Sequence, residues 1–186
     1  MNAPAKHADG DGGQAEGPGW PEEIHAVLKE AKVAQAPYVP DGGHARLIEL
    51  LHADPEIRAI SLTTEEEGIP LAAGAWLGGE RSVMLMQSSG VGNCINMLSL
   101  LKSGRFPFLT LVTMRGEWGE FNPWQVPMGS KVQQSFEMMD VTVMRADQAG
   151  DVAETVRAAA RMAFEGGTPV AVLLSQRLIG AKVFVK

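Results

Sequence analysis

Short apolar runs alternating with helical segments constrain the fold of this chain more than any other feature. The runs are strand-sized and lie at residues 57–63, 82–87, 106–114, 141–146 and 169–175. Strands that are apolar along their whole length are typical of parallel sheets with helices on both faces. With right-handed crossovers, we expect an α/β fold with a doubly wound, mainly parallel sheet.

The segments between these runs have the spacing of amphipathic helices. Helices are expected at residues 21–33, 42–55, 68–79, 94–104, 129–140 and about 150–165. Residues 36–40 form only a short extended piece. In the last helix one face is expected to be buried, and it consists of Val152, Val156, Ala159, Ala160, Ala163 and Phe164.

Length and composition indicate one soluble domain. The 186 residues are enough for a single core. Residues 1–19 are rich in Gly, Ala and Asp and are expected to be a disordered tail before a domain at 20–186. The net charge of −6 argues against nucleic acid as a partner, and the single cysteine, Cys94, excludes an internal disulfide. Without a signal peptide or a membrane-length apolar run, the expected location is cytoplasmic.

An acidic cluster follows the first long apolar run. Glu65, Glu66 and Glu67 stand at an expected strand-to-helix junction, and ligands of open α/β sheets bind at the carboxyl ends of strands. For Glu66 and Glu67 the simpler interpretation is favourable interaction with the helix dipole. Glu65 comes first after the strand, so it can turn toward the sheet and share a proton with a ligand nitrogen.

Two further segments combine polar groups with loop positions. The first, QSSGVGN at residues 87–93, lets the backbone approach a ligand at Gly90 and Gly92, although an ordinary structural loop remains an alternative. The second is the long loop after residue 114, which carries Trp118 and Trp124. Loops of this length are often functional. The alternative is a surface excursion whose tryptophans cap the core.

The remaining candidates have simpler explanations. The four histidines, His7, His25, His44 and His52, are scattered over the tail and helix faces. Their spacing indicates neither a metal site nor a catalytic triad. We therefore predict no metal ligands in this chain, and Cys94 is interpreted as a small core residue.

Three motifs, in order, resemble the pyrimidine-binding domain of thiamin-diphosphate enzymes. They resemble more narrowly the α subunit of sulfopyruvate decarboxylase and the matching half of phosphonopyruvate decarboxylase. The motifs are EEEG-x3-AAGA-x-L-x-G from Glu65, MQ-x-SG-x-GN from Met86, and RGE from Arg115 followed by Q-x-PMG from Gln125. The resemblance extends from about residue 21 to residue 175.

The resemblance implies specific roles for residues in these motifs. Counting back nine residues from Gly74 gives Glu65 as the carboxylate that bonds the cofactor's aminopyrimidine ring and stabilises its imino form. Arg115 and Gln125 become candidates for holding an anionic substrate tail, since a guanidinium pairs well with such oxygens. The residues implied to lie beside the thiazolium ring and the substrate are Gln87, Ser88, Gly90, Gly92 and Asn93.

The resemblance also implies a second chain. Related enzymes hold the diphosphate and Mg2+ through a domain with a GDG motif and a later asparagine, whereas the GDG here, at residues 10–12, lies in the Gly-rich tail. We therefore expect a separate diphosphate-binding β subunit with a GDG…N motif, in a heterotetramer or a larger even-numbered complex. Apolar and aromatic surface in the region 90–128 would then be interface.

The expected activity is decarboxylation of a small anionic 2-oxo acid, such as sulfopyruvate or phosphonopyruvate, to CO2 and an aldehyde. Thiamin diphosphate and Mg2+ are the implied cofactors, with Mg2+ held by the partner. Two alternatives remain open: a carboligase or acyltransferase subunit with the same cofactor, and a non-catalytic binding module of the same fold.

Overall fold

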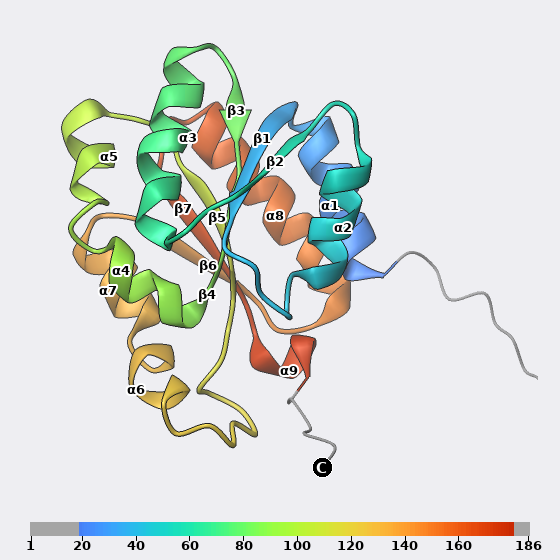
Figure 1. Cartoon of the computed structure of the whole chain (residues 1–186), viewed down its shortest axis with the longest axis vertical. Coiled ribbons are helices and arrows are strands. Elements are labelled where there is room, and N and C mark those ends of the chain that lie inside the picture. Colours follow the sequence, from blue (N-terminus) through green and yellow to red (C-terminus); the bar gives the residue numbers. More distant parts are fainter. Residues whose placement is uncertain (1–18, 181–186) are drawn as a thin grey trace, which may run out of the picture.

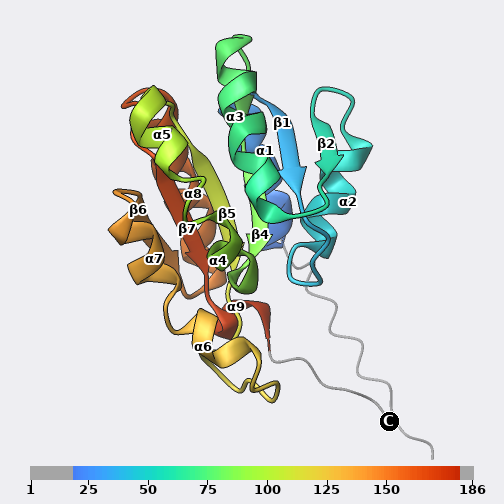
Figure 2. The same ribbon diagram turned by 60° about the vertical axis from the view of Figure 1, so that its left-hand side comes forward.

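The chain forms three layers, with a parallel sheet between two groups of helices (Figures 1 and 2). The structure is a computed structural model, and it describes residues 19–180. Helices α1, α2 and α8 pack on one face of the sheet, and α3, α4, α5 and α7 pack on the other. The doubly wound fold expected from the sequence is therefore confirmed.

The elements follow the predicted alternation. The strands are β1 Val33–Tyr38, β2 Arg58–Ser61, β3 Arg81–Ser82, β4 Met84–Gln87, β5 Leu109–Thr113, β6 Thr142–Ala146 and β7 Val170–Leu174. The α-helices are α1 Trp20–Glu30, α2 Ala45–Ala53, α3 Gly68–Leu77, α4 Val91–Cys94, α5 Ser99–Gly104, α6 Gln125–Gly129, α7 Val132–Met138, α8 Ala149–Phe164 and α9 Gln176–Ile179. Two 3-10 turns, Glu65–Glu67 and Ser88–Gly90, precede α3 and α4.

The strand order brings several strand ends to one edge of the sheet. The order is β2-β1-β4-β5-β7-β6, with β3 also pairing with β1, and these pairs are parallel. Gln87 lies opposite Thr113, and Thr113 lies opposite Leu174, so these three strands end in register. The strand order switches side between β1 and β4, because β1 leads to β2 on one side and the chain then returns to β4 on the other. Open α/β sheets bind ligands at such a switch point.

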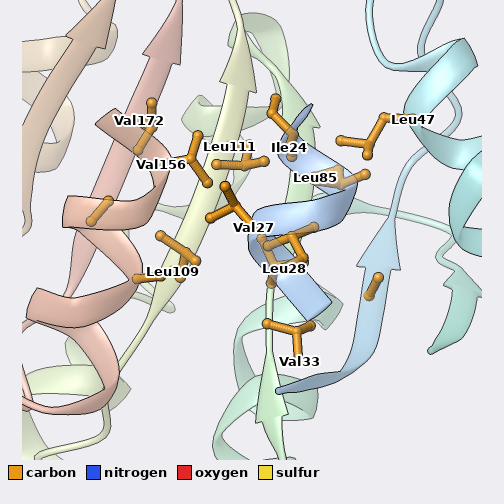
Figure 3. Packing of buried hydrophobic residues seen from close by; sticks show 14 of the residues in the cluster. Ile24, Val27, Leu28, Val33, Leu47, Leu85, Leu109, Leu111, Val156 and Val172 are labelled. Atoms are coloured by element: carbon orange, nitrogen blue, oxygen red, sulfur yellow. The ribbon is translucent and has the colours of Figure 1, made fainter. Parts of the chain in front are cut away.

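Two apolar clusters, one on each face, hold the layers together. Figure 3 shows the cluster in which α1 and α8 cover the sheet, with Val27 and Val156 beside Leu109 and Leu111. Full burial of such a side chain is worth roughly 1.5–3 kcal/mol. The face of α8 that was predicted to be buried is buried at all six positions. The opposite cluster includes Met84, Met86 and Cys94, as core residues.

Three local predictions are wrong. The helix predicted at 94–104 is formed only from Ser99 onward as α5, because a turn at 95–98 separates it from α4. Val33 begins a strand and does not end α1. That strand, β1, is longer than the predicted extended piece and pairs with β2, β3 and β4. The predicted tail at 1–19 lies, apart from Gly19, outside the described residues.

Candidate active site at the carboxyl edge of the sheet

Glu65 is the buried member of the acidic cluster. Its residue surface is 9% exposed, whereas Glu66 is half-buried and Glu67 is exposed. Thr64 Oγ1 donates to Glu66 Oε2 at 3.2 Å, and Thr63 N donates to Glu67 Oε2 at 3.0 Å. Two carboxylates therefore close the turn before α3, and the first one is left to face the neighbouring loop.

Glu65 packs against the backbone of the loop after β4. Asn93 Nδ2 donates to Glu65 Oε2 at 2.8 Å. A Cβ atom at Gly90 would lie 2.2 Å from Glu65 Cδ, so only glycine leaves room for this carboxylate. Within residues 19–180, Glu65 Oε1 has no hydrogen-bond partner. One oxygen of a buried carboxylate thus remains for a group that these residues do not supply.

Ser88 joins the ends of β4 and β5. Its fully buried Oγ accepts a hydrogen bond from Arg115 N at 3.0 Å and lies 3.4 Å from Arg115 O, to which it can donate. Ser88 is predicted to line the site, but its hydroxyl is already hydrogen-bonded to the backbone of Arg115. Nearby, a Cβ at Gly92 would lie 3.0 Å from Met128 Sδ, so the loop also packs closely against α6.

A polar cluster around Asp41 occupies the reversal point between β1 and β4. The carboxylate accepts hydrogen bonds from Thr113 Oγ1, from Gly43 N at 2.9 Å and from Gln87 Nε2 at 3.3 Å. His44 Nδ1 lies 3.1 Å from Asp41 Oδ2, at ion-pair distance. Burial by itself raises the pKa of Asp41, but His44 and the hydrogen-bond donors hold that pKa well below its usual range.

This cluster is not among the sites predicted from the sequence. His44 is fully buried beside Asp41, so the prediction that the histidines lie scattered on the tail and on helix faces is wrong for His44. The sequence does contain a signal, the polar segment Asp-Gly-Gly-His at 41–44, which begins three residues after the end of β1. Glu65 is predicted as a site residue from the same kind of position, a polar segment that follows a strand.

Arg115 is paired with a carboxylate of its own loop. Its Nε and Nη2 donate to the two oxygens of Glu120, both at 2.6 Å. Glu120 also accepts from Gly116 N, Asn122 N and Gln176 Nε2. The hydrogen bonds from Arg115 outweigh the effect of burial and lower the pKa of Glu120 to about 2. Nη1 of Arg115 has no hydrogen-bond partner among residues 19–180.

The rest of this loop is strongly exposed. Trp118, Phe121 and Trp124 are 49%, 52% and 82% exposed, so the alternative in which the tryptophans cap the core is wrong. Gln125 begins α6, which packs against the Ser88–Gly90 turn. Its Oε1 is buried and has no hydrogen-bond partner among the described residues. The loop with these exposed aromatic side chains therefore leads into α6, beside the residues predicted to bind ligands. Figure 2 shows α4, α6 and α9 toward one end of the molecule.

A pocket of about 150 Å3 opens between Asp41 and Arg115, and Thr113 and Gly180 also line it. In the part of the chain from 19 to 180, no group of three acidic, histidine or cysteine side chains could hold a metal ion. No helix in that part is long and apolar enough to cross a membrane. The arrangement suits a small polar ligand at the strand ends.

Comparison with curated proteins identifies the family. The α subunit of sulfopyruvate decarboxylase from Methanothermobacter thermautotrophicus is 33% identical over 154 residues, which are 82% of this chain and 93% of that protein. The chain belongs to the family of sulfopyruvate decarboxylase α subunits. Membership confirms the resemblance stated from the motifs. No family model matches the sequence.

Two further similarities concern a second decarboxylase and the fold. Phosphonopyruvate decarboxylase from Streptomyces viridochromogenes is 38% identical over 99 residues, which are 53% of this chain and 25% of that protein. Among solved structures, 2-oxoglutarate:ferredoxin oxidoreductase from Magnetococcus marinus superposes with a TM-score of 0.69 at 14% identity. This chain spans 29% of the length of that oxidoreductase chain, and at this identity the match shows the fold alone.

Proposed function

We propose that this chain is the pyrimidine-binding subunit of a two-chain, thiamin-diphosphate-dependent decarboxylase of small anionic 2-oxo acids. The observation that carries the proposal is the buried Glu65 carboxylate, held at the strand edge with Oε1 unpartnered, in a member of this family. Sulfopyruvate and phosphonopyruvate are the candidate substrates, after the names of the relatives.

The residues around Glu65 fit the aminopyrimidine end of that cofactor. Oε1 of Glu65 can exchange a proton with a ring nitrogen, while Asn93 holds Oε2 and Gly90 leaves room for the carboxylate. When bound, thiamin diphosphate supplies the electron-accepting ring needed for loss of CO2 from a 2-oxo acid. The diphosphate and Mg2+ are assigned to a partner subunit with the GDG…N motif that the resemblance implies.

Arg115 is proposed to bind the anionic tail of the substrate. Glu120 fixes the guanidinium through Nε and Nη2, and Nη1 remains for a sulfonate, phosphonate or carboxylate oxygen. Arg115→Ala should raise the KM about tenfold or more, since a hydrogen bond to a charged group is worth roughly 1.5–3 kcal/mol. An unchanged KM would remove this role.

Glu65→Gln and Glu66→Gln form a matched pair that tests the proposal. Both variants are co-expressed with the diphosphate-binding partner, and CO2 release from sulfopyruvate, phosphonopyruvate and pyruvate is measured with Mg2+ and thiamin diphosphate. Loss of proton exchange should lower kcat by about 10²–10⁴-fold in Glu65→Gln and leave Glu66→Gln within about twofold. Equal activity of the two variants contradicts the role of Glu65.

A further inference from the structure

The side chain of Gln87 is held from both ends. Its Nε2 donates to Asp41 Oδ1 at 3.3 Å, and its Oε1 accepts a hydrogen bond from Ser89 Oγ at 2.9 Å. An ionised carboxylate can only accept hydrogen bonds, so Asp41 determines which end of the amide carries the nitrogen. The orientation of Gln87 is therefore set by its neighbours and is not free to reverse.

One donor of the Gln87 amide remains available. An amide nitrogen carries two hydrogens, and one of them is directed to Asp41. Within residues 19–180, Gln87 Nε2 has no second partner. Gln87 ends β4, at the edge where Glu65 also lies, so the remaining N–H is available to a ligand at that edge.

Asp41 is suited to hold this amide rigidly. Its side chain is 5% exposed, and Thr113, Gly43 and His44 surround both of its oxygens. The backbone of the Asp41 loop also packs closely against β5, since a Cβ at Gly43 would lie 2.8 Å from Thr113 Cγ2. Asp41 is thereby fixed to β5 as well as to its own loop. A carboxylate with this many donors stays ionised and does not serve as a proton donor.

We propose that Asp41 is a positioning residue, which holds Gln87 so that the second N–H of its amide is presented to an oxygen of the bound 2-oxo acid. The proposal rests on the proposed function and names a residue of the same site. Fixed donors aimed at a developing charge contribute more than mobile ones, because they need no reorganisation during the reaction.

The first test uses NMR of the ¹⁵N-labelled full chain and does not depend on activity. The side-chain NH2 signals of Gln87 are assigned by their loss in Gln87→Ala. Asp41→Asn should move the Gln87 proton that is bonded to the carboxylate, because the charged acceptor is lost. If Asp41→Asn does not fold, the wild-type spectrum decides: Gln87 signals at the position of a freely hydrated amide overturn the proposal, as do signals unchanged by Asp41→Asn.

Asp54→Asn is the matched control for this test. Asp54 is a second buried aspartate with a histidine neighbour, since its side chain is 4% exposed and His25 Nε2 lies 2.9 Å from Oδ2. It stands at the other end of α2, away from Gln87. Asp54→Asn should lower the melting temperature and leave the Gln87 signals in place.

The second test is a double-mutant cycle in the complex with the diphosphate-binding partner, with sulfopyruvate as substrate. Misplacing a reacting group by about 1 Å can cost about 10²-fold, so Asp41→Asn should lower kcat/KM by roughly 10–100-fold. In the Gln87→Ala background the same change should have little further effect, because the two residues act as one unit. An equal loss in both backgrounds, or none in either, overturns the proposal.

The two tests separate this inference from the proposed function. A wild-type complex without CO2 release contradicts the proposed function, and the NMR result still decides whether Asp41 orients Gln87. Activity that collapses in Glu65→Gln but persists in Asp41→Asn contradicts the positioning role alone.

Discussion

Two buried aspartates, each beside a histidine, lie at opposite ends of α2 and bond to different parts of the fold. Asp54, after the helix, contacts His25 and Lys29 of α1 and accepts from Glu56 N in its own turn. Asp41, before the helix, is bonded to groups from its own loop, from β4 and from β5. The first ties one helix to a turn, while the second connects three strand ends.

The difference shows what distinguishes the two edges of this sheet. At the amino edge, polar groups pair locally and near solvent, as Lys29 does at 41% side-chain exposure. At the carboxyl edge, polar groups from separate strands converge, and among the described residues Nε2 of His44 and Oε1 of Gln125 are buried there without a hydrogen-bond partner. Buried polar groups without partners are costly, so they indicate a place for a ligand.

Gly90→Ala should have a large effect on both stability and activity at this edge. The new Cβ would overlap Glu65 Cδ, so the carboxylate or the loop must move. We expect a loss of about 1–3 kcal/mol of unfolding free energy and a fall in kcat/KM of about 100-fold. Chemical denaturation measures the loss of unfolding free energy, and the CO2 assay measures the fall in kcat/KM.

Gly150→Ala is the control, because no atom lies within 4 Å of a Cβ built there. It should stabilise the chain by roughly 0.4–1 kcal/mol and leave the activity unchanged. If both variants behave alike, the close packing of Gly90 against Glu65 does not matter for function.

Glu120→Gln should have an intermediate effect, mainly on stability and its pH dependence. The folded-state pKa of about 2 lies below the ordinary value of 4.5, so ionised Glu120 stabilises the fold fully above about pH 4.5 and loses this contribution as the pH falls toward 2. The variant should lose about 2 kcal/mol at pH 7. Its unfolding free energy should fall less steeply than that of the wild type between pH 4.5 and 2.

An exposed glutamate provides the comparison for Glu120. Glu165 pairs with Arg161 at 61% side-chain exposure, so Glu165→Gln should change stability by less than about 1 kcal/mol. Equal acid sensitivity of wild type and Glu120→Gln would show that the Arg115–Glu120 pair does not stabilise the loop.

Trp124→Ser should have the smallest effect on the isolated chain. The side chain is 82% exposed, so the unfolding free energy should change by no more than about 0.5 kcal/mol. Affinity for the diphosphate-binding partner should fall by about 2 kcal/mol if Trp124 is a buried anchor of the complex. Met138→Ser, at 64% exposure on α7, is the control, and equal affinities for both variants contradict an interface here.

Most of the fold could be predicted because buried parallel strands are apolar along their whole length. β1 was underestimated since Val33–Tyr38 contains Gln35 and Pro37 and lacks a continuous apolar run. Its place in the sheet comes from pairing with β2 and β4, which the local sequence does not record.

The candidate site could be predicted only where the chemistry is local in sequence. Glu65 lies in the turn between β2 and α3, a position the sequence pattern predicts, and its burial agrees with a role there. The contact between Asp41 and Thr113 joins residues 72 positions apart, so it depends on strand order. The pairing of Arg115 with Glu120 depends on the conformation of an irregular loop, which residue types alone do not fix.

The most direct test of the central claim is an omission series for CO2 release from sulfopyruvate. This chain, the diphosphate-binding partner, thiamin diphosphate and Mg2+ are combined, and each is left out in turn. Release only when all four are present is the predicted result, since the proposed function makes the carboxyl edge that holds Glu65 one half of a site shared with the partner. Undiminished release without this chain, or none from the complete mixture, would contradict the account.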